Sequence, residues 1–171
     1  MKHCFACGHK LEMRELEHEG MTPFCPNCKE FRFPIFNTAV SMVVVNPKED
    51  KILMIQQYGR ESNILVAGYV NKGESGEDAL RREMEEEIGR KVIKHRFMKT
   101  EYFPKSNTLI WNFAVMIDSE DLSGVCEWEV DKATWFTFEE AKKSVKHDSL
   151  AERFLYYFFK KYETKTGDFF E

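Results

Sequence analysis

Four of the five cysteines form two Cys-x-x-Cys pairs near the start of the chain, Cys4 with Cys7 and Cys25 with Cys28. Two such pairs supply four sulfur ligands for a tetrahedral Zn²⁺ ion. The surrounding segment is rich in turn residues and poor in aliphatic ones, so it cannot fold on a hydrophobic core alone. We therefore expect residues 1–34 to form a zinc ribbon with a structural ion. A redox dithiol and a disulfide pair are the alternatives.

The remainder of the chain has the composition of a globular domain. The 171 residues are 43% hydrophobic, and the net charge is −4, so no overall basic field attracts nucleic acid or an anionic membrane. No apolar run approaches the roughly 20 residues of a membrane span, and the polar N-terminus does not resemble a signal peptide. We expect a cytoplasmic protein with no membrane partner.

Residues 35–171 alternate strand-like and helix-like patterns, which predicts a second domain of the α/β class. Turn residues separate most of the segments. Strands are expected at 39–45, 51–57, 63–70, 92–103, 108–117 and 134–138, and helices at 76–88, 139–146 and 150–162.

The helix expected at 76–88 carries an unusual concentration of acidic residues. Seven acidic residues and two arginines lie between Glu74 and Glu87. Glu83, Glu86 and Glu87 are spaced to share an arc of about 100° on an α-helix. Three converging carboxylates suit a hard cation such as Mg²⁺ or Mn²⁺. The alternative is an exposed acidic helix without a metal.

This stretch resembles the Nudix box, G-x5-E-x7-R-E-U-x-E-E-x-G-U, where U is apolar. Its fixed positions are occupied by Gly68, Glu74, Arg82, Glu83, Met84, Glu86, Glu87 and Gly89, while Arg90 replaces an apolar residue. The resemblance implies an α/β/α sandwich with a mixed sheet. It also implies that Glu83, Glu86 and Glu87 bind the catalytic metals, that Arg82 orients a glutamate, and that Glu74 supports the loop before the helix.

A zinc ribbon directly before a Nudix domain is similar to the NADH pyrophosphatase branch of that family. The aromatic-Pro step at Phe33 and the sequence Ala-Gly-Tyr-Val around Tyr69 also resemble that branch. Of its marker S-Q-P-W-P-F-P-x-S, only Phe103, Pro104 and Ser106 remain. The resemblance implies that the substrate is bound by Gly68, Tyr69, Phe33, Phe103 and Ser106, with Tyr69 stacked on a base.

Glu129 falls on the glutamate of a further element of the branch, K-E-x-x-x-A-x-W-Y. This resemblance makes Glu129 a candidate metal ligand or general base. The alternative is a surface residue beside a turn. Trp135 and Phe136 in the same segment are expected to pack in the core.

Together these features predict a Mg²⁺-dependent Nudix hydrolase that cleaves a nucleoside diphosphate linked to another group, with an NAD(H)-like dinucleotide favoured. The alternatives are an ADP-ribose or nucleotide-sugar pyrophosphatase, an enzyme that removes NAD caps from RNA, and a ligand sensor without catalysis. The ribbon shows no basic patch, so nucleic acid is expected only as a capped RNA 5′ end. The resemblance also favours a homodimer.

Overall fold

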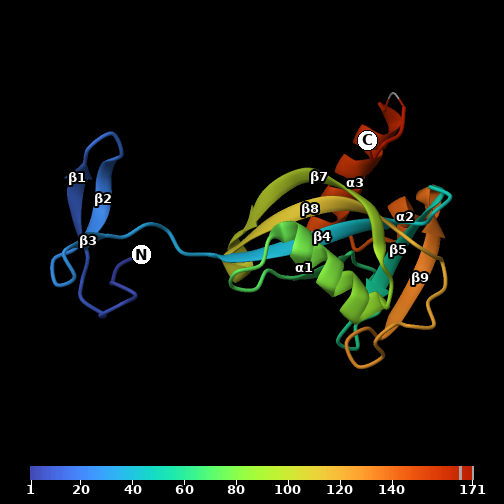
Figure 1. The fold of residues 1–171 in the computed structure, drawn as a ribbon, viewed down its shortest axis with the longest axis horizontal. Helices are drawn as coiled ribbons and strands as arrows, with labels where there is room; N and C mark the ends of the chain where they lie inside the picture. The colour runs from blue at the N-terminus through green and yellow to red at the C-terminus, as the bar shows by residue number, and fades with distance from the viewer. Residues whose placement is uncertain (166, 171) are drawn as a thin grey trace. The chain divides into compact units, whose positions relative to one another are not determined.

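The computed structural model of the chain describes residues 1–165 and 167–170. These residues form two compact units, Met1–Phe36 and Asn37–Glu171, each with its own β-sheet (Figure 1). In the described part of the chain, no helix has the length and apolar character needed to cross a membrane.

The first unit is a three-stranded antiparallel sheet built from β1 (Glu12–Leu16), β2 (Gly20–Cys25) and β3 (Glu30–Phe31). Its cysteines converge from the two ends of the segment. The sulfur of Cys4 lies 3.9 Å from that of Cys28, the sulfur of Cys7 lies 3.5 Å from that of Cys25, and all four lie within 4.8 Å of one another. Zn–S bonds of about 2.3 Å in a tetrahedron place sulfurs about 3.8 Å apart, so the cluster has the dimensions of a zinc site.

Arg32 supports this cluster from β3's C-terminal side. Its buried guanidinium donates from Nε to Cys4 Sγ at 3.2 Å and from Nη1 to Glu30 at 2.5 Å. This hydrogen bond lowers the pKa of Cys4 to about 6, whereas the neighbouring Cys7 sulfur raises the pKa of Cys28 to about 12. Four adjacent thiols therefore resist ionising together, and a bound cation removes that conflict.

The second unit contains a six-stranded mixed sheet. Its strands are β4 (Asn37–Val45), β5 (Lys51–Gln56), β6 (Val66–Tyr69), β7 (Val92–Phe103), β8 (Thr108–Ile117) and β9 (Lys132–Thr137). The order is β7-β8-β4-β5-β9, and β6 also pairs with β4. The β4–β8 pair is parallel and the other pairs are antiparallel.

Strand β4 is the centre of this sheet because one of its edges serves two partners. Residues Ala39 to Met42 pair with β6, and Val44 and Val45 pair with β5. The sheet therefore divides along this edge, and β6 and β5 continue as separate strands. Strand β4 can occupy this position because it is buried on both faces from Ala39 to Val45.

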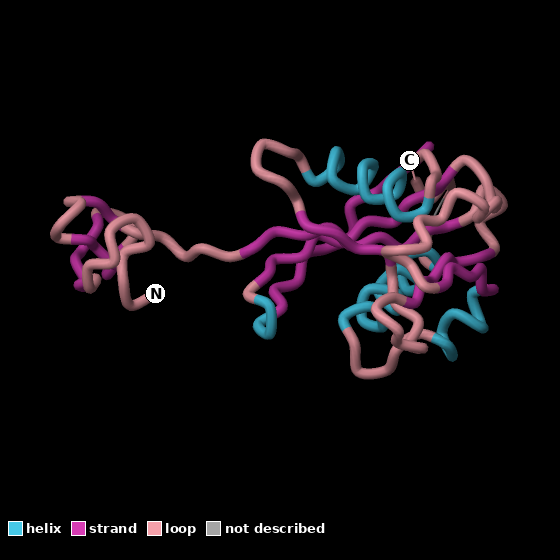
Figure 2. The backbone as a smooth tube through the Cα atoms, turned by 90° about the horizontal axis from the view of Figure 1, so that it is seen from below, coloured by secondary structure: helices cyan, strands magenta, loops and turns pink. Residues whose placement is uncertain are grey.

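Helices cover both faces of the sheet (Figure 2). On one face, α1 (Gly76–Glu83) and the π-helical turn Met84–Ile88 pack their apolar residues against Val40, Met42 and Val44. On the other face, α2 (Phe138–Ser144) and α3 (Leu150–Glu163) pack against alternate residues of the same strand, Val43 and Val45. Alternate apolar residues of β4 thus belong to two hydrophobic cores, one on each face of the sheet. The expected α/β/α sandwich is confirmed.

Most of the expected elements occur within two residues of their expected bounds, and two differ more clearly. The strand expected at 63–70 is shorter, because only Val66–Tyr69 forms a ladder while Asn63 and Ile64 make isolated bridges. The helix expected at 76–88 is α-helical only to Glu83 and ends in a π-helical turn. A π turn bonds residue i to i+5, so the angular spacing expected for Glu83, Glu86 and Glu87 does not apply unchanged.

We predict one Zn²⁺ per chain, bound by Cys4, Cys7, Cys25 and Cys28. Cys4→Ser should abolish zinc binding and unfold the first unit, because the two large hydrophobic clusters belong to the second unit. Metal analysis and hydrogen exchange measure the two effects. Cys126→Ser is the control and should leave both unchanged. Purified protein with four reduced thiols and no zinc would contradict the prediction.

Candidate active site

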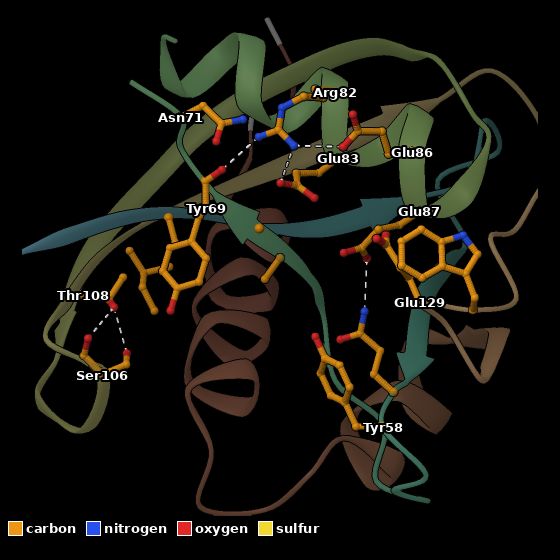
Figure 3. Close-up of a pocket in the computed structure, with 16 residues that line it drawn as sticks. Tyr58, Tyr69, Asn71, Arg82, Glu83, Glu86, Glu87, Ser106, Thr108 and Glu129 are labelled. Carbon is orange, nitrogen blue, oxygen red and sulfur yellow. Dashed lines mark hydrogen bonds and ion pairs between the residues drawn. The ribbon is translucent and has the colours of Figure 1, made fainter. Parts of the chain in front are cut away.

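A cavity of about 600 Å³ opens where the edge of β4 passes from β6 to β5 (Figure 3). Its walls come from strands, from the acidic helix and from three loops. The lining residues are Ala39, Gln57, Tyr58, Ala67, Gly68, Tyr69, Asn71, Arg82, Glu83, Glu86, Glu87, Ser106, Thr108, Ile110, Trp128 and Glu129.

Local sequence fixes the start and end of the acidic helix. The Ser75 side chain caps its N-terminus by accepting a hydrogen bond from the backbone N–H of Asp78 at 3.1 Å. Gly89 ends the π turn with φ of 68°, and a Cβ there would lie 2.5 Å from the carbonyl oxygen of Gly124. The buried Leu80, together with the apolar residues of the π turn, anchors the helix to the sheet, so its acidic residues face the cavity rim.

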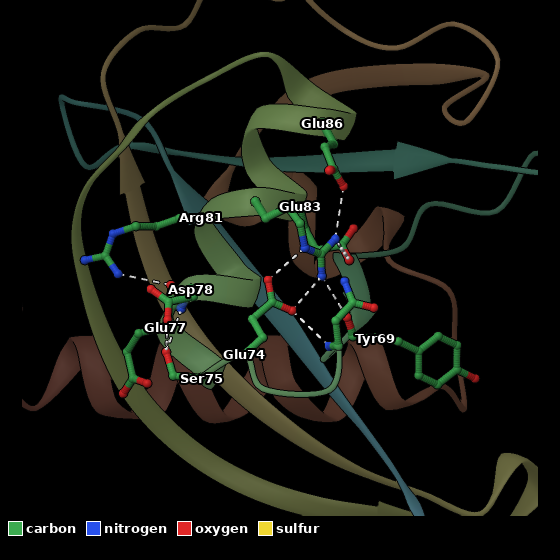
Figure 4. A network of polar contacts seen from close by, with 10 residues as sticks. Tyr69, Glu74, Ser75, Glu77, Asp78, Arg81, Glu83 and Glu86 are labelled. Atoms are coloured by element: carbon green, nitrogen blue, oxygen red, sulfur yellow. Dashed lines mark hydrogen bonds and ion pairs between the residues drawn. The ribbon is translucent and has the colours of Figure 1, made fainter.

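Arg82 is the centre of a polar network in which all five of its N–H donors are used. Figure 4 shows the acceptor residues Tyr69, Glu74, Glu83 and Glu86 around it. Nε and Nη2 bind the two carboxylate oxygens of Glu74 at 2.8 and 3.0 Å. Nη1 donates to Glu83 at 2.7 Å and to Glu86 at 3.0 Å, and Nη2 also donates to the carbonyl oxygen of Tyr69 at 2.9 Å. The guanidinium therefore joins β6, the following loop and the helix.

Glu74 is a structural member of this network and does not line the cavity. Besides Arg82, it accepts a hydrogen bond from the backbone N–H of Asn71 at 2.9 Å. The hydrogen bonds from Arg82, followed by that from Asn71, lower the pKa of Glu74. It therefore stays ionised and holds the loop against the helix, in the role that the sequence resemblance implies.

Glu83 and Glu87 are buried, with 8% and 6% of their surface exposed. Burial raises the pKa of Glu83 despite its contact with Arg82. Burial, followed by the charges of Glu83 and Glu129, raises the pKa of Glu87 to about 8. The Glu87 carboxylate accepts a hydrogen bond from the amide Nε2 of Gln57 at 3.4 Å. Such a group is stable as an anion only when a cation approaches it.

Gly68 makes room for the Glu83 carboxylate. A Cβ at this position would lie 1.9 Å from the carboxyl carbon of Glu83 and 2.0 Å from one of its oxygens. The backbone φ of Gly68 is ordinary, so the need for glycine here arises from close approach, not from strain. Strand β6 therefore acts as a floor against which this carboxylate lies.

The charges that line the cavity fit a hard divalent cation. Four carboxylates, of Glu83, Glu86, Glu87 and Glu129, face one guanidinium whose donors are already occupied. Within the described residues, only the four cysteines have metal-binding atoms all within 4.8 Å of one another, so the carboxylates are more widely spread. Arg82 lies between Glu83 and Glu86 and binds both, and the side chain of Glu86 is 57% exposed. The donor set is that of a Mg²⁺ or Mn²⁺ site.

Tyr69 lies at a different edge of the cavity, on the face of the sheet opposite α1 (Figure 3). Its ring is 56% exposed, and it pairs in register with Ala39, whose neighbour on β8 is Ile110. Ser106 and Thr108 complete this edge, with their hydroxyl oxygens 2.8 Å apart. An exposed ring above small and apolar residues is a surface on which a base can stack.

The structure brings together most of the residues singled out from the sequence. Gly68, Tyr69, Ser106 and Glu129 line the cavity with the acidic residues. Phe103 is absent from its wall although it lies in the described chain, and Phe33 belongs to the first unit.

Other residues that line the wall were not predicted from the sequence. Gln57, Tyr58, Asn71, Thr108 and Trp128 stand in loops or at strand ends, where no periodic pattern distinguishes them. The remaining three, Ala39, Ala67 and Ile110, lie within strands expected from the sequence.

Comparison with known proteins finds one matching domain family and related solved structures. The family model described as NUDIX domain matches residues 36–160. A Nudix hydrolase from Nitrosomonas europaea superposes with a TM-score of 0.66 at 18% identity, covering 96% of this chain and 94% of that one. A second solved structure from that organism gives a TM-score of 0.61 at 21% identity, covering 74% and 90%. These structures confirm the fold.

Curated relatives include proteins named NAD-capped RNA hydrolase NudC. That of Salmonella schwarzengrund is 29% identical over 141 residues, covering 81% of this chain and 52% of the relative. That of Escherichia coli O9:H4 is 28% identical over the same coverage. The chain thus spans about half the length of the curated relatives it matches. Because the family model covers most of the sequence and the acidic helix carries the family's box, the chain belongs to the Nudix family.

Proposed function

We propose that the chain hydrolyses the diphosphate of a nucleoside diphosphate linked to another group, with Mg²⁺ or Mn²⁺ as cofactor. The observation that carries the proposal is the pair of buried carboxyl groups of Glu83 and Glu87, in a cavity that also exposes the ring of Tyr69. A diphosphate brings further negative charge, so cations are needed between it and the carboxylates. An NAD(H)-like dinucleotide is the favoured substrate.

Each side chain has a distinct task in this proposal. Glu83, Glu86 and Glu87 would hold the cations, and Arg82 keeps Glu83 and Glu86 in place. Bound divalent cations supply a polarised phosphoryl oxygen and a water of lowered pKa. Glu129 faces the same cavity and is free to ligate a cation or to accept a proton from that water. Tyr69 positions the base.

Two other substrate classes compete with a dinucleotide. A nucleotide sugar such as ADP-ribose carries the same diphosphate with one base. An NAD-capped RNA is suggested by the names of the curated relatives. A sensor without catalysis is disfavoured because Arg82, Glu83, Glu86 and Glu87 are all present in the cavity. We also propose a homodimer, as the sequence resemblance implies.

The test is a hydrolysis assay of NADH, NAD⁺, ADP-ribose and NAD-capped RNA with Mg²⁺ or Mn²⁺, with product identification. We expect a nucleoside monophosphate from NADH or NAD⁺. No diphosphate cleavage of any of the four compounds with either ion would refute the proposed function.

Glu86→Gln and Glu87→Gln should each leave the fold unchanged and remove most of the turnover. Loss of a charged ligand is expected to raise the barrier by several kcal/mol, each ~1.4 kcal/mol being about tenfold in rate. Steady-state kinetics and circular dichroism measure the two effects. Glu77→Gln, on the exposed first turn of α1, is the matched control. Rates near wild type in both cavity variants would refute the assignment of these ligands.

Mg²⁺ binding should strengthen as pH rises toward about 8, because the ion must displace the proton from Glu87. Above that pH the affinity should level off. The same raised pKa means that the unfolded chain, whose glutamates titrate near about 4.3, binds fewer protons than the folded one. The stability of the metal-free protein should therefore fall between these two pH values as pH rises.

Calorimetric titration with Mg²⁺ at several pH values measures this dependence. Glu87→Gln removes the titrating proton and should weaken binding while flattening its pH dependence. An equal slope of affinity against pH in wild type and variant would show that another group takes up the proton.

Gly68→Ala should preserve the fold but displace the Glu83 carboxylate, since the new methyl group would occupy its position. The clash involves the flexible end of a side chain, so we expect little change in melting temperature. A displacement of an ångström or more should reduce kcat by about a hundredfold. Gly76→Ala is the matched control, because its Cβ would make ordinary contacts 3.7 Å or more from Phe113. Unchanged kcat in Gly68→Ala would contradict this view of Glu83.

A further inference from the structure

Two aromatic side chains on the cavity wall are almost fully exposed. Tyr58 is 82% exposed and Trp128 is 84% exposed, and both line the same cavity as the carboxylates. Large aromatic rings bury much of their surface in most folded domains, and exposed ones gather at binding sites. Tyr58 lies outside the motifs that the proposed function uses, and Trp128 stands where the K-E-x-x-x-A-x-W-Y element has its lysine, so the element itself predicts no aromatic ring there.

The loops that carry these rings are tied to each other. The backbone N–H of Asp131 donates to the carbonyl oxygen of Gln56 at 2.9 Å, and the N–H of Gly59 donates to the Asp131 carboxylate at 2.7 Å. Tyr58 lies between the two residues joined on one loop, and Trp128 lies three residues before Asp131 on the other. The two rings therefore stand on one braced segment of the cavity rim.

Tyr58 is also held in an unfavourable backbone conformation. Its φ is 59°, in the left-handed region that bulky residues rarely adopt. A glycine or asparagine would occupy this position with less strain. Strain of this kind at a cavity rim indicates that the aromatic side chain is needed there.

These rings stand at a different edge of the cavity from Tyr69. Tyr69 lies beside Ser106 and Thr108, whereas Tyr58 follows Gln57, whose amide contacts Glu87 (Figure 3). Trp128 directly precedes Glu129. Glu83 and Glu86 are bound by Arg82, which also donates to the carbonyl oxygen of Tyr69. A diphosphate bound at the carboxylates would therefore have the ring of Tyr69 on one side and the rings of Tyr58 and Trp128 on the other.

We infer that Tyr58 and Trp128 form a second aromatic subsite, which binds a flat ring on the group beyond the diphosphate. The inference rests on the proposed function and deepens it, because it selects compounds with two bases over nucleotide sugars with one. With one base of the substrate on Tyr69 and its second ring at Trp128, the diphosphate between them lies at the carboxylates.

Diadenosine diphosphate and ADP-ribose test this inference, because they differ only in the second adenine. Trp128→Ala should raise KM for diadenosine diphosphate about tenfold and leave that for ADP-ribose unchanged. Trp128→Phe should restore the wild-type value. Tyr58→Asn removes the second ring while tolerating the left-handed backbone and should act in the same direction. Tyr156→Ala, an exposed residue of α3 outside the cavity wall, is the control.

Three outcomes would overturn the subsite. The first is that Trp128→Ala and Tyr58→Asn change neither KM, and the second is that they change both KM values equally. The third is a shift of the oligomeric state in sedimentation with no change in the preference between the two compounds, which would make the rings a subunit contact. If the wild type cleaves neither compound, hydrolysis of NADH, NAD⁺ and NAD-capped RNA decides the proposed function separately. Calorimetric binding of the same two compounds then tests the subsite. Equal affinities of wild type and Trp128→Ala for diadenosine diphosphate would refute it.

Discussion

The guanidinium of Arg82 is the interaction on which the geometry of the cavity depends. Its five donors reach the carbonyl oxygen of β6 at Tyr69, the loop through Glu74, and the helix through Glu83 and Glu86. A single exposed ion pair contributes little, about 0–1 kcal/mol. A planar group with every donor occupied, however, fixes the relative positions of three segments. Those positions determine where the carboxylates stand relative to the ring of Tyr69.

The cavity exists because β4 shares one edge between two strands. Were β5 to continue along β4, its backbone would fill the position of β6, and the acidic helix would have no floor. Instead, β6 pairs with residues Ala39 to Met42 and ends beside the network of Arg82. The close contact of Gly68 with Glu83 depends on this placement. The pairing of β6 with β4 therefore places Gly68 where its missing side chain leaves room for Glu83.

The helices and strands could be predicted from the sequence because hydrophobic alternation and turn residues are local patterns. Strands β7 and β8 begin and end at the expected residues, and Ser75 and Gly89 mark the ends of the acidic helix. The π turn could not be predicted, because nothing in the sequence of residues 84–88 distinguishes it from an α-helix. Contacts across long loops were also hidden.

Two pairs of residues that are far apart in the sequence come close together only in the folded chain. Arg90 departs from the apolar pattern of the box, and the structure pairs it with Asp121, 31 residues further along the chain. Tyr58 and Trp128 lack any periodic context, and only the fold places both on one cavity. Local sequence patterns thus predict the helices, the strands and the residues of a motif. The residues at the edge of the cavity can be identified only from the tertiary structure.

The chain holds two clusters that would select different cations by ligand chemistry. Four cysteine sulfurs within 4.8 Å of one another favour a soft, tetrahedral ion, and Arg32 stabilises one of them as a thiolate. The carboxylates of Glu83 and Glu87 are hard oxygen ligands in a cavity open to substrate. A closed thiolate site has no coordination position for a diphosphate, whereas the carboxylates leave room for one. In the proposed function, structural and catalytic metal binding would therefore be separated by chemistry as well as by position in the sequence.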